Sequence, residues 1–257
     1  MAGTVKVAVE GGLATVRMGR ANGNAVNPEL SADLALAFRE AGADPAIRGV
    51  LFAASGKIFS PGLDVLELLE LDRGEMDRFM ADFHRTLFTL FAFPKPMVAA
   101  LHGHAIAGGC VLSLTADWRV LADRALIGLN EIRVGVPLPY GVTQILREVI
   151  APQHITEVAL LGRNFRGEEA LVPGLAHEIH PSEGFEAHCL SRLDELASRD
   201  MRSFAATKRY FRSVTVERVP GREDKLRQEF LDCWFSPETR ERMQSIVAQL
   251  KSSQAKP

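Results

Sequence analysis

Short apolar runs alternate along this chain with longer stretches whose apolar residues recur at helical spacing. Gly49–Ala54 and Met97–Leu101 are apolar without interruption, and Arg119–Ala122 is a third strand-like run. Strands that are apolar on both sides are typical of a sheet covered by helices on both faces. The alternation of such strands with helices predicts an α/β fold whose strands are mostly parallel.

The two ends of the chain extend this pattern differently. Val5–Val9 and Leu13–Met18 are separated by two glycines, which predicts a β-hairpin. Asn27 and Pro28 are typical of the N-cap and first turn of a helix. After a last strand-like piece, Ala176–His180, we expect only helices.

The composition limits the classes of protein to which the chain can belong. Its 257 residues suffice for one domain of ordinary size, or for one domain with an appendage. A formal charge of −2 gives no general attraction to nucleic acid or to an anionic membrane. No apolar segment reaches the roughly 20 residues of a membrane helix, and the N-terminus does not resemble a signal peptide. Three widely spaced cysteines suit neither a disulfide framework nor a zinc site, so we expect a soluble, cytoplasmic protein.

Two segments place glycine where a strand passes into a helix. They are Phe59–Asp64 and His102–Cys110. The first N–H groups of a helix have no intrahelical acceptor, and glycine lets a ligand oxygen approach them closely. One donor from each segment would suit the oxyanion that develops in a thioester. Composition alone also allows the bland interpretation, two ordinary glycine-rich turns.

A third segment, Ile127–Val136, contains a carboxylate among aliphatic residues. Such surroundings raise the pKa of a carboxyl group, so Glu131 is a candidate base or acid near neutral pH. The alternative is that Glu131 pairs with a nearby cation, either Arg133 or Arg147.

The three segments, in this order and spacing, resemble the crotonase (enoyl-CoA hydratase/isomerase) superfamily. The resemblance extends from Val5 to Pro181, and Lys95–Ala100 and the pair Gly162-Arg163 also fit. It implies a spiral of repeated strand-strand-helix units in residues 1–195. It also implies a C-terminal helical region, residues 196–257, that mediates contacts in a homotrimer or a dimer of trimers.

The resemblance also implies roles for individual residues. The oxyanion-hole N–H groups correspond to Leu63 and Gly108, and the first segment binds coenzyme A together with the loop Asn22–Asn27. The residues expected to contact the substrate are Ala25, Phe59, Pro61, Gly62, Gly109, Val111, Pro139 and Tyr140. No metal is expected, and no cofactor apart from the coenzyme A of an acyl-CoA substrate.

Two positions favour one reaction within the superfamily. Enoyl-CoA hydratases carry a glutamate where this chain has Val111, and a second one that corresponds to Glu131. A single glutamate can still move a proton from the alpha to the gamma carbon of a thioester, and the motifs resemble those of delta-3, delta-2-enoyl-CoA isomerases. Pro61 and Arg133 depart from the usual pattern, and Arg133 leaves the acyl specificity open.

Other activities stay open as alternatives. They are hydration of the enoyl-CoA, or hydrolysis or decarboxylation of an acyl-CoA by a related enzyme with one carboxylate. An RNA-binding relative has a lysine-rich helix in its N-terminal part. The corresponding stretch here, Glu29–Asp44, carries more acid than base, which disfavours RNA binding.

Several polar residues are expected to have structural roles. Backbone or packing contacts are expected for His102, His104, Asp64, Asp117 and Cys110. The basic cluster Lys208–Arg212 is interpreted as a solvated helix face, with binding of the coenzyme A phosphates as the alternative.

Overall fold

The computed structural model describes residues 3–254, without the side chains of residues 220 and 250–254. Its strands are β1 (Val5–Glu10), β2 (Leu13–Met18), β3 (Gly49–Ala54), β4 (Met97–Leu101), β5 (Ala105–Ile106), β6 (Trp118–Ala122), β7 (Leu126–Gly128), β8 (Asn164–Arg166) and β9 (Glu178–His180). Its α-helices are α1 (Pro28–Ala43), α2 (Val65–Leu68), α3 (Arg73–Phe91), α4 (Gly108–Leu114), α5 (Glu131–Val134), α6 (Tyr140–Val149), α7 (Phe185–Ala197), α8 (Met201–Arg218), α9 (Pro220–Trp234) and α10 (Pro237–Gln254). Single turns of other helix types are η1 (Pro152–His154), η2 (Thr156–Leu160) and η3 (Gly167–Ala170).

The larger sheet contains six strands in the order β1-β2-β3-β4-β6-β9. β1 and β2 form the predicted antiparallel hairpin, and every other neighbouring pair in this sheet is parallel. Every residue of β3 and of β4 is buried, as the unbroken apolar runs predicted. The α/β fold class is therefore confirmed.

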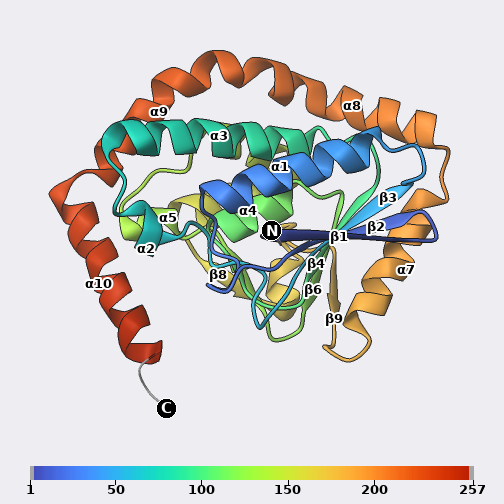
Figure 1. Cartoon of the computed structure of the whole chain (residues 1–257), viewed down its shortest axis with the longest axis horizontal. Helices are drawn as coiled ribbons and strands as arrows, with labels where there is room; N and C mark the ends of the chain where they lie inside the picture. Colours follow the sequence, from blue (N-terminus) through green and yellow to red (C-terminus); the bar gives the residue numbers. More distant parts are fainter. Residues whose placement is uncertain (1–2, 255–257) are drawn as a thin grey trace.

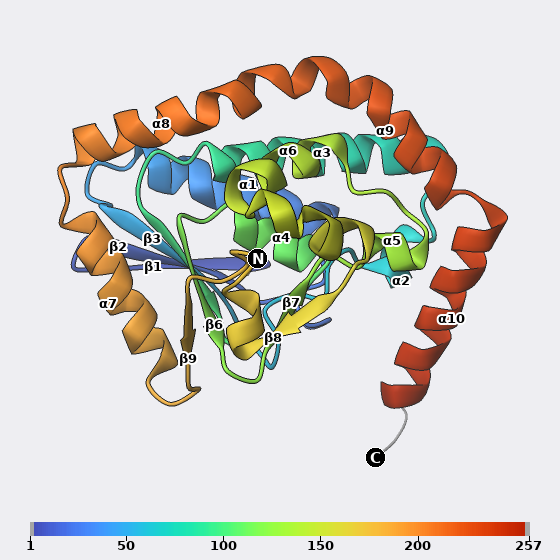
Figure 2. The same ribbon diagram turned by 180° about the vertical axis from the view of Figure 1, so that it is seen from behind.

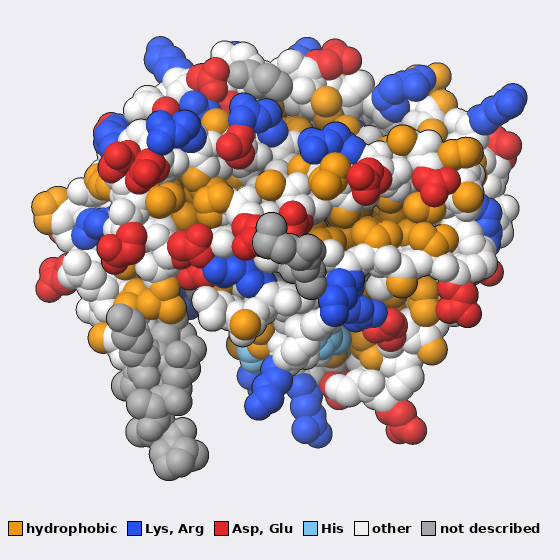
Figure 3. All heavy atoms as spheres, viewed as in Figure 1, with side chains coloured by type: hydrophobic (Ala, Val, Ile, Leu, Met, Phe, Trp, Pro, Cys, Tyr) orange, Lys and Arg blue, Asp and Glu red, His pale blue; other side chains and the backbone are white. Residues whose placement is uncertain are grey.

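Helices cover both faces of this sheet (Figures 1 and 2). α1 packs on β1 and β2, whereas α7 packs on β3 and β4. α1 begins where the sequence predicted, because the Asn27 side chain accepts a hydrogen bond from the N–H of Leu30 at 2.9 Å and Pro28 occupies the first turn. Hydrophobic side chains remain exposed near β1 and α1 (Figure 3), among them Val7, Val9 and Leu36.

The smaller sheet has the order β5-β7-β8. β5 pairs parallel with β7, and β7 pairs antiparallel with β8. β5 leads into α4, and β7 is followed at once by the turn that starts α5. The smaller sheet thus carries the second and third glycine segments of the sequence side by side.

The C-terminal helices form a separate layer over this core. α8 and α9 arc across α3, and α10 then runs away from them (Figures 1 and 2). The bend between α8 and α9 falls at Pro220, a residue that lacks the N–H needed to continue a helix. A domain boundary at residue 195 stays a prediction, and α7 runs across it. Within residues 3–254, no helix is long and apolar enough to span a membrane.

Candidate active site

Backbone hydrogen bonds join the three segments that the sequence analysis singled out, Phe59–Asp64, His102–Cys110 and Ile127–Val136. The N–H of Ile106 donates to the carbonyl oxygen of Ser60 at 3.0 Å, which ties the second segment to the first. The N–H of Ala107 donates to the carbonyl oxygen of Gly128 at 2.9 Å, which ties the second segment to the third. Residues nearly 70 positions apart in the chain, Ser60 and Gly128, are therefore linked through one short stretch of backbone.

Leu63 and Gly108, the expected oxyanion donors, lie next to each other. A Cβ placed on Gly62 would be 3.0 Å from the nitrogen of Gly108, and one placed on Gly108 would be 3.5 Å from the nitrogen of Leu63. Gly62 has φ +103°, which a side chain would strain. Among the residues that the structure describes, neither the Leu63 nor the Gly108 N–H has a hydrogen-bond acceptor. Both donors are therefore free to bind a ligand.

Ala107 supports this arrangement with an unfavourable backbone conformation. It has φ 49° and ψ −125° at the N-cap of α4, a region that non-glycine residues rarely occupy. Such strain persists where the surrounding structure imposes it, and it occurs frequently at functional sites. Here the conformation of Ala107 sets the direction of the N–H of Gly108.

A cavity of about 190 Å³, called the Glu131 cavity below, opens beside these donors. It is lined by Pro61, Leu63, Val65, Met80, Phe83, Ala107, Gly108, Val111, Asn130, Glu131, Val134, Val136, Pro139, Val142, Phe230, Trp234, Met243 and Ile246. Six of the residues predicted from the sequence are in this lining: Pro61, Leu63, Gly108, Val111, Glu131 and Pro139. The structure therefore brings the expected base and both expected donors to one cavity.

Glu131 is the first residue of α5, and no cation among the described side chains pairs with its carboxyl group. Its Oε2 atom is buried without a hydrogen-bond partner, and removal from water raises its pKa to about 7. The alternative that Glu131 pairs with Arg133 or Arg147 is wrong, because both arginines are exposed and neither forms an ion pair with it. A carboxyl group with this pKa can accept and release a proton near neutral pH.

Five residues expected at the substrate lie outside this lining: Ala25, Phe59, Gly62, Gly109 and Tyr140. The side chain of Phe59 is fully buried, with its ring edge-to-face against Phe52 at 5.2 Å between centroids. A Cβ on Gly109 would lie 2.3 Å from the carbonyl oxygen of Ser60, so this glycine permits the close packing of two segments. Tyr140 lines a neighbouring cavity of about 180 Å³.

The C-terminal helices contribute residues that the sequence did not assign to the site. Phe230 and Trp234 of α9, with Met243 and Ile246 of α10, line the Glu131 cavity. Both aromatic side chains of α9 are buried, with Phe230 3% exposed and Trp234 1%. Aromatic residues in a helix indicate that one of its faces is buried, but the sequence does not show that Phe230 and Trp234 cover the Glu131 cavity.

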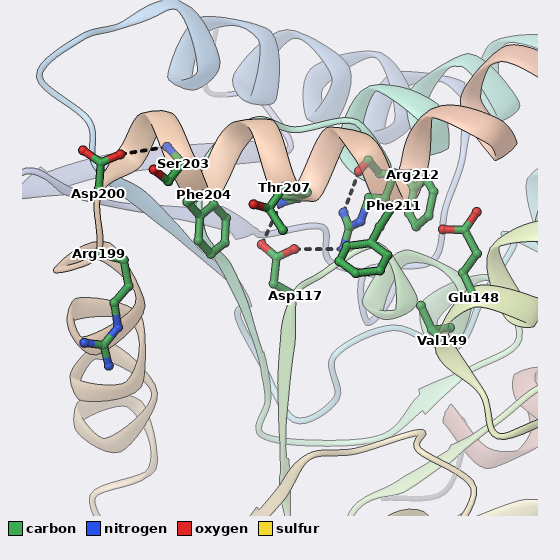
Figure 4. A pocket seen from close by; sticks show the side chains of 12 residues that line it. Asp117, Glu148, Val149, Arg199, Asp200, Ser203, Phe204, Thr207, Phe211 and Arg212 are labelled. Carbon is green, nitrogen blue, oxygen red and sulfur yellow. Dashed lines mark hydrogen bonds and ion pairs between the residues drawn. The ribbon is translucent and has the colours of Figure 1, made fainter.

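A larger cavity of about 700 Å³ lies elsewhere, below α8, and is called the Asp117 cavity (Figure 4). Asp117 contacts the Nζ of Lys208 at 2.6 Å and a guanidinium nitrogen of Arg212 at 2.8 Å. The interpretation of this cluster as a solvated face is wrong for these two side chains, because both point inward to Asp117. Burial lowers the pKa of Lys208 to about 8. Their engagement with Asp117 gives no support to phosphate binding at this place.

The remaining polar residues make the structural contacts that were expected. His102 and His104 bond to the backbone, the latter by accepting from the N–H of Leu126 at 3.0 Å. Cys110 is buried, and burial raises the pKa of its thiol, so it is not a thiolate near neutral pH. Asp64 caps the short helix α2.

Comparisons with known proteins agree with this arrangement. The family model described as enoyl-CoA hydratase/isomerase matches residues 8–252. A probable enoyl-CoA hydratase of Mycobacterium leprae is 32% identical over 200 residues, 76% of each protein. The human mitochondrial enoyl-CoA delta isomerase 1 is 26% identical over 256 residues, 97% of this chain and 85% of the human protein.

A solved structure extends the similarity to the whole fold. The crystal structure of human mitochondrial delta3-delta2-enoyl-CoA isomerase superposes with a TM-score of 0.92 at 25% identity. The superposition covers 97% of this chain and 99% of the human one. The chain is therefore a member of the enoyl-CoA hydratase/isomerase family, with the crotonase fold, and it acts on acyl-CoA thioesters.

Proposed function

We propose that this enzyme isomerises 3-enoyl-CoA to 2-enoyl-CoA with Glu131 as its single base. The carboxylate of Glu131 removes a proton from C2 of the thioester, and the electron pair moves toward the carbonyl oxygen to form an enolate. The same carboxyl group returns the proton to C4. The double bond between C3 and C4 is thereby lost, and one between C2 and C3 is formed.

The N–H groups of Leu63 and Gly108 stabilise the enolate oxygen in this proposal. Both are without an acceptor among the described residues, and both residues line the Glu131 cavity. Donors that are already positioned do not need to reorganise as charge develops. The proposed contact of the loop Asn22–Asn27 with coenzyme A is supported by its attachment to the first segment, where the N–H of Val26 donates to the carbonyl oxygen of Gly62 at 2.8 Å.

The observation that carries the proposal is the number of carboxyl groups in the Glu131 cavity. Among the described residues that line it, Glu131 is the only acid. Hydration by a pair of glutamates needs one group to activate water while the other delivers a proton. Val111, which is 2% exposed, cannot do either, whereas isomerisation requires only one group.

Hydration stays the second candidate. The Mycobacterium leprae relative is named a probable enoyl-CoA hydratase at 32% identity, which exceeds the 26% of the human isomerase. A hydrolase or decarboxylase with one carboxylate is the third. All three reactions would use the same oxyanion hole. They differ in whether Glu131 exchanges a proton with the acyl chain or with a water molecule, or assists cleavage of the thioester or of a carbon–carbon bond.

A panel of thioesters on the purified protein tests the proposal. We expect turnover of 3-enoyl-CoA that is much faster than hydration of 2-enoyl-CoA or cleavage of malonyl-type and 3-oxo thioesters. Chromatography of the products identifies the reaction directly. Faster formation of 3-hydroxyacyl-CoA from 2-enoyl-CoA than of 2-enoyl-CoA from 3-enoyl-CoA would replace isomerisation by hydration as the function.

Substitution of Gly108 tests the oxyanion hole separately. Gly108→Pro removes the N–H, and loss of one such donor lowers the rate by about a hundred- to a thousandfold. Gly108→Ala is the matched control, because it keeps the N–H and its Cβ would meet Gly62 only at 3.4 Å. Circular dichroism of both variants establishes that they fold. Equal rates for the two variants would remove Gly108 from the proposed hole.

We also propose the trimer, or dimer of trimers, that the family resemblance implies. Support comes from α8, where Tyr210 is 69% exposed, Phe211 77% and Val214 51%, since large apolar side chains are unusual on a free surface. Light scattering tests this, and a monodisperse monomer would contradict it. The free thiols of Cys110, Cys189 and Cys233 support a reducing compartment, the cytoplasm.

A further inference from the structure

One residue that lines the Glu131 cavity carries a buried hydrogen-bond donor that has no partner among the described residues. Trp234 lines the cavity and is 1% exposed, and within the part of the chain that the structure describes its indole Nε1 has no hydrogen-bond partner. An indole nitrogen can only donate, so it requires an acceptor. The mechanism proposed above makes no use of this group.

An unpaired donor at this place is unfavourable for the protein alone. A buried N–H without an acceptor loses its hydrogen bond to water and gains none in return, and nearly all buried polar groups in native proteins are paired. The ring of Phe230 stacks on Trp234, with 6.0 Å between centroids and 23° between planes. Packing therefore fixes the indole, and a phenylalanine could pack similarly without the unpaired N–H. The missing acceptor is thus expected to arrive with a ligand.

The cavity walls restrict what that acceptor is. Apart from Trp234, the polar side chains of the lining are Asn130 and Glu131. A ligand carboxylate would lie near the carboxylate of Glu131 in an apolar enclosure, where like charges repel strongly. The thioester oxygen is already assigned to the N–H groups of Leu63 and Gly108. A neutral oxygen farther along the acyl chain is the acceptor that remains.

We infer that Trp234 is a specificity-determining residue that donates its indole N–H to a neutral oxygen on the acyl chain. The substrate class is an acyl-CoA whose chain carries a hydroxyl, ether or carbonyl oxygen beyond the reacting carbons. The inference rests on the proposed function only in taking an acyl-CoA as the ligand. It holds whichever reaction Glu131 performs.

Binding of saturated acyl-CoA thioesters tests the inference apart from the chemistry, because a saturated chain cannot be isomerised or hydrated. The series has equal chain lengths, with one methylene after another replaced by an ether oxygen or a carbonyl group. Calorimetry of the unmodified protein should find one position at which the oxygenated chain binds about tenfold more tightly than the plain chain. A plain chain that binds as tightly as every oxygenated one overturns the inference.

Two matched variants assign the preference to the indole. Trp234→Phe keeps an aromatic ring and removes the donor, so the ratio of the two Kd values should approach one. The chain has one other tryptophan, Trp118, whose indole N–H donates to Glu178 at 2.7 Å. Trp118→Phe should leave the ratio unchanged.

The outcomes separate the two proposals. Retention of the full preference by Trp234→Phe would exclude Trp234 as its source and overturn the inference. Failure of every thioester to bind the unmodified protein would overturn the proposed function and this inference together. Binding without a preference for oxygen would overturn this inference alone.

Discussion

Glu131 and Asp117 both hold a carboxylate largely away from water, yet their surroundings are opposite. Asp117 contacts Lys208 and Arg212, and it also accepts from the N–H of Met97 at 2.8 Å. The Oε2 atom of Glu131 has no hydrogen-bond partner in the described part of the chain, and removal from water raises the pKa of this carboxyl group to about 7.

The contrast fits a structural role for the carboxylate of Asp117 and the proposed catalytic role for that of Glu131. Around Asp117, two cations from α8 compensate the charge, so the contact fastens α8 to the start of β4. Around Glu131, the charge is uncompensated, and the proton can be exchanged near neutral pH. A partnerless carboxyl group beside unpaired N–H donors is therefore a stronger indication of chemistry than the larger cavity at Asp117.

The largest effect on catalysis is expected when Glu131, the carboxylate without a cationic neighbour among the described residues, is replaced. Glu131→Gln should lower kcat for the proposed isomerisation by about a hundredfold or more, because a general base contributes on that scale. Binding of a saturated acyl-CoA, measured by calorimetry, should survive. Glu168→Gln is the control, since Glu168 is exposed. If Glu131→Gln isomerises at the normal rate, Glu131 is not the base.

Asp117, whose charge is compensated by Lys208 and Arg212, should contribute to the free energy of unfolding. Asp117→Asn leaves Lys208 and Arg212 without their anion, and breaking a buried ion pair in this way costs about 3–5 kcal/mol. Denaturant unfolding measures the change. The control is Asp82→Asn, which removes an exposed pair with Arg85 and should cost less than about 1 kcal/mol. Equal losses of stability would show that Asp117 is no more structural than a surface residue.

Lowering the pH should reduce kcat/KM gradually, and near pH 7 the loss should be smaller than that caused by Glu131→Gln. The base must be ionised, and with a pKa of about 7 Glu131 is increasingly protonated below that pH. The acid side of the kcat/KM profile should therefore bend near pH 7, with about a tenfold loss for each unit below it. A bend near 4.5, the ordinary pKa of glutamate, would mean that Glu131 is solvated in the free enzyme.

The same shift makes a prediction about stability. Because the folded protein keeps the Glu131 proton to a higher pH than the unfolded chain does, the contribution of this group to stability falls as pH rises from about 4.5 to about 7. Glu131→Gln should abolish that fall. Unfolding curves across this range, for both proteins, measure the difference.

The smallest effect is expected from adding a second carboxyl group. Val111→Glu should raise hydration of 2-enoyl-CoA only slightly, because no supporting contacts have been built around the new side chain. Stability should decrease, since Val111 is 2% exposed and burying a carboxylate is unfavourable. Efficient hydration by the unmodified protein would contradict the interpretation of this position.

Local features of the sequence predicted the buried strands of the fold and drew attention to the segments that line the candidate site. Unbroken apolar runs identify buried strands because both faces of such strands are covered. The glycines near Leu63 and Gly108 mark backbone that must adopt a positive φ or approach another segment closely, as Gly62 does. An acid in an aliphatic stretch, Glu131, signals a desolvated carboxyl group. Each of these signals depends on neighbours within a few residues.

Only the tertiary structure decided which side chains meet across the chain. Lys208 and Asp117 are 91 positions apart, and helical spacing alone did not tell whether the Lys208 side chain faces water or protein. It likewise gave no sign that α9 and α10 bring Trp234 and Met243 to the cavity of Glu131. Periodicity specifies which face of a helix is apolar, whereas the docking of that face depends on the shape and volume of the whole core. For this reason the sequence could point to Glu131 as a candidate base, whereas it could not show that the indole of Trp234 lines the same cavity.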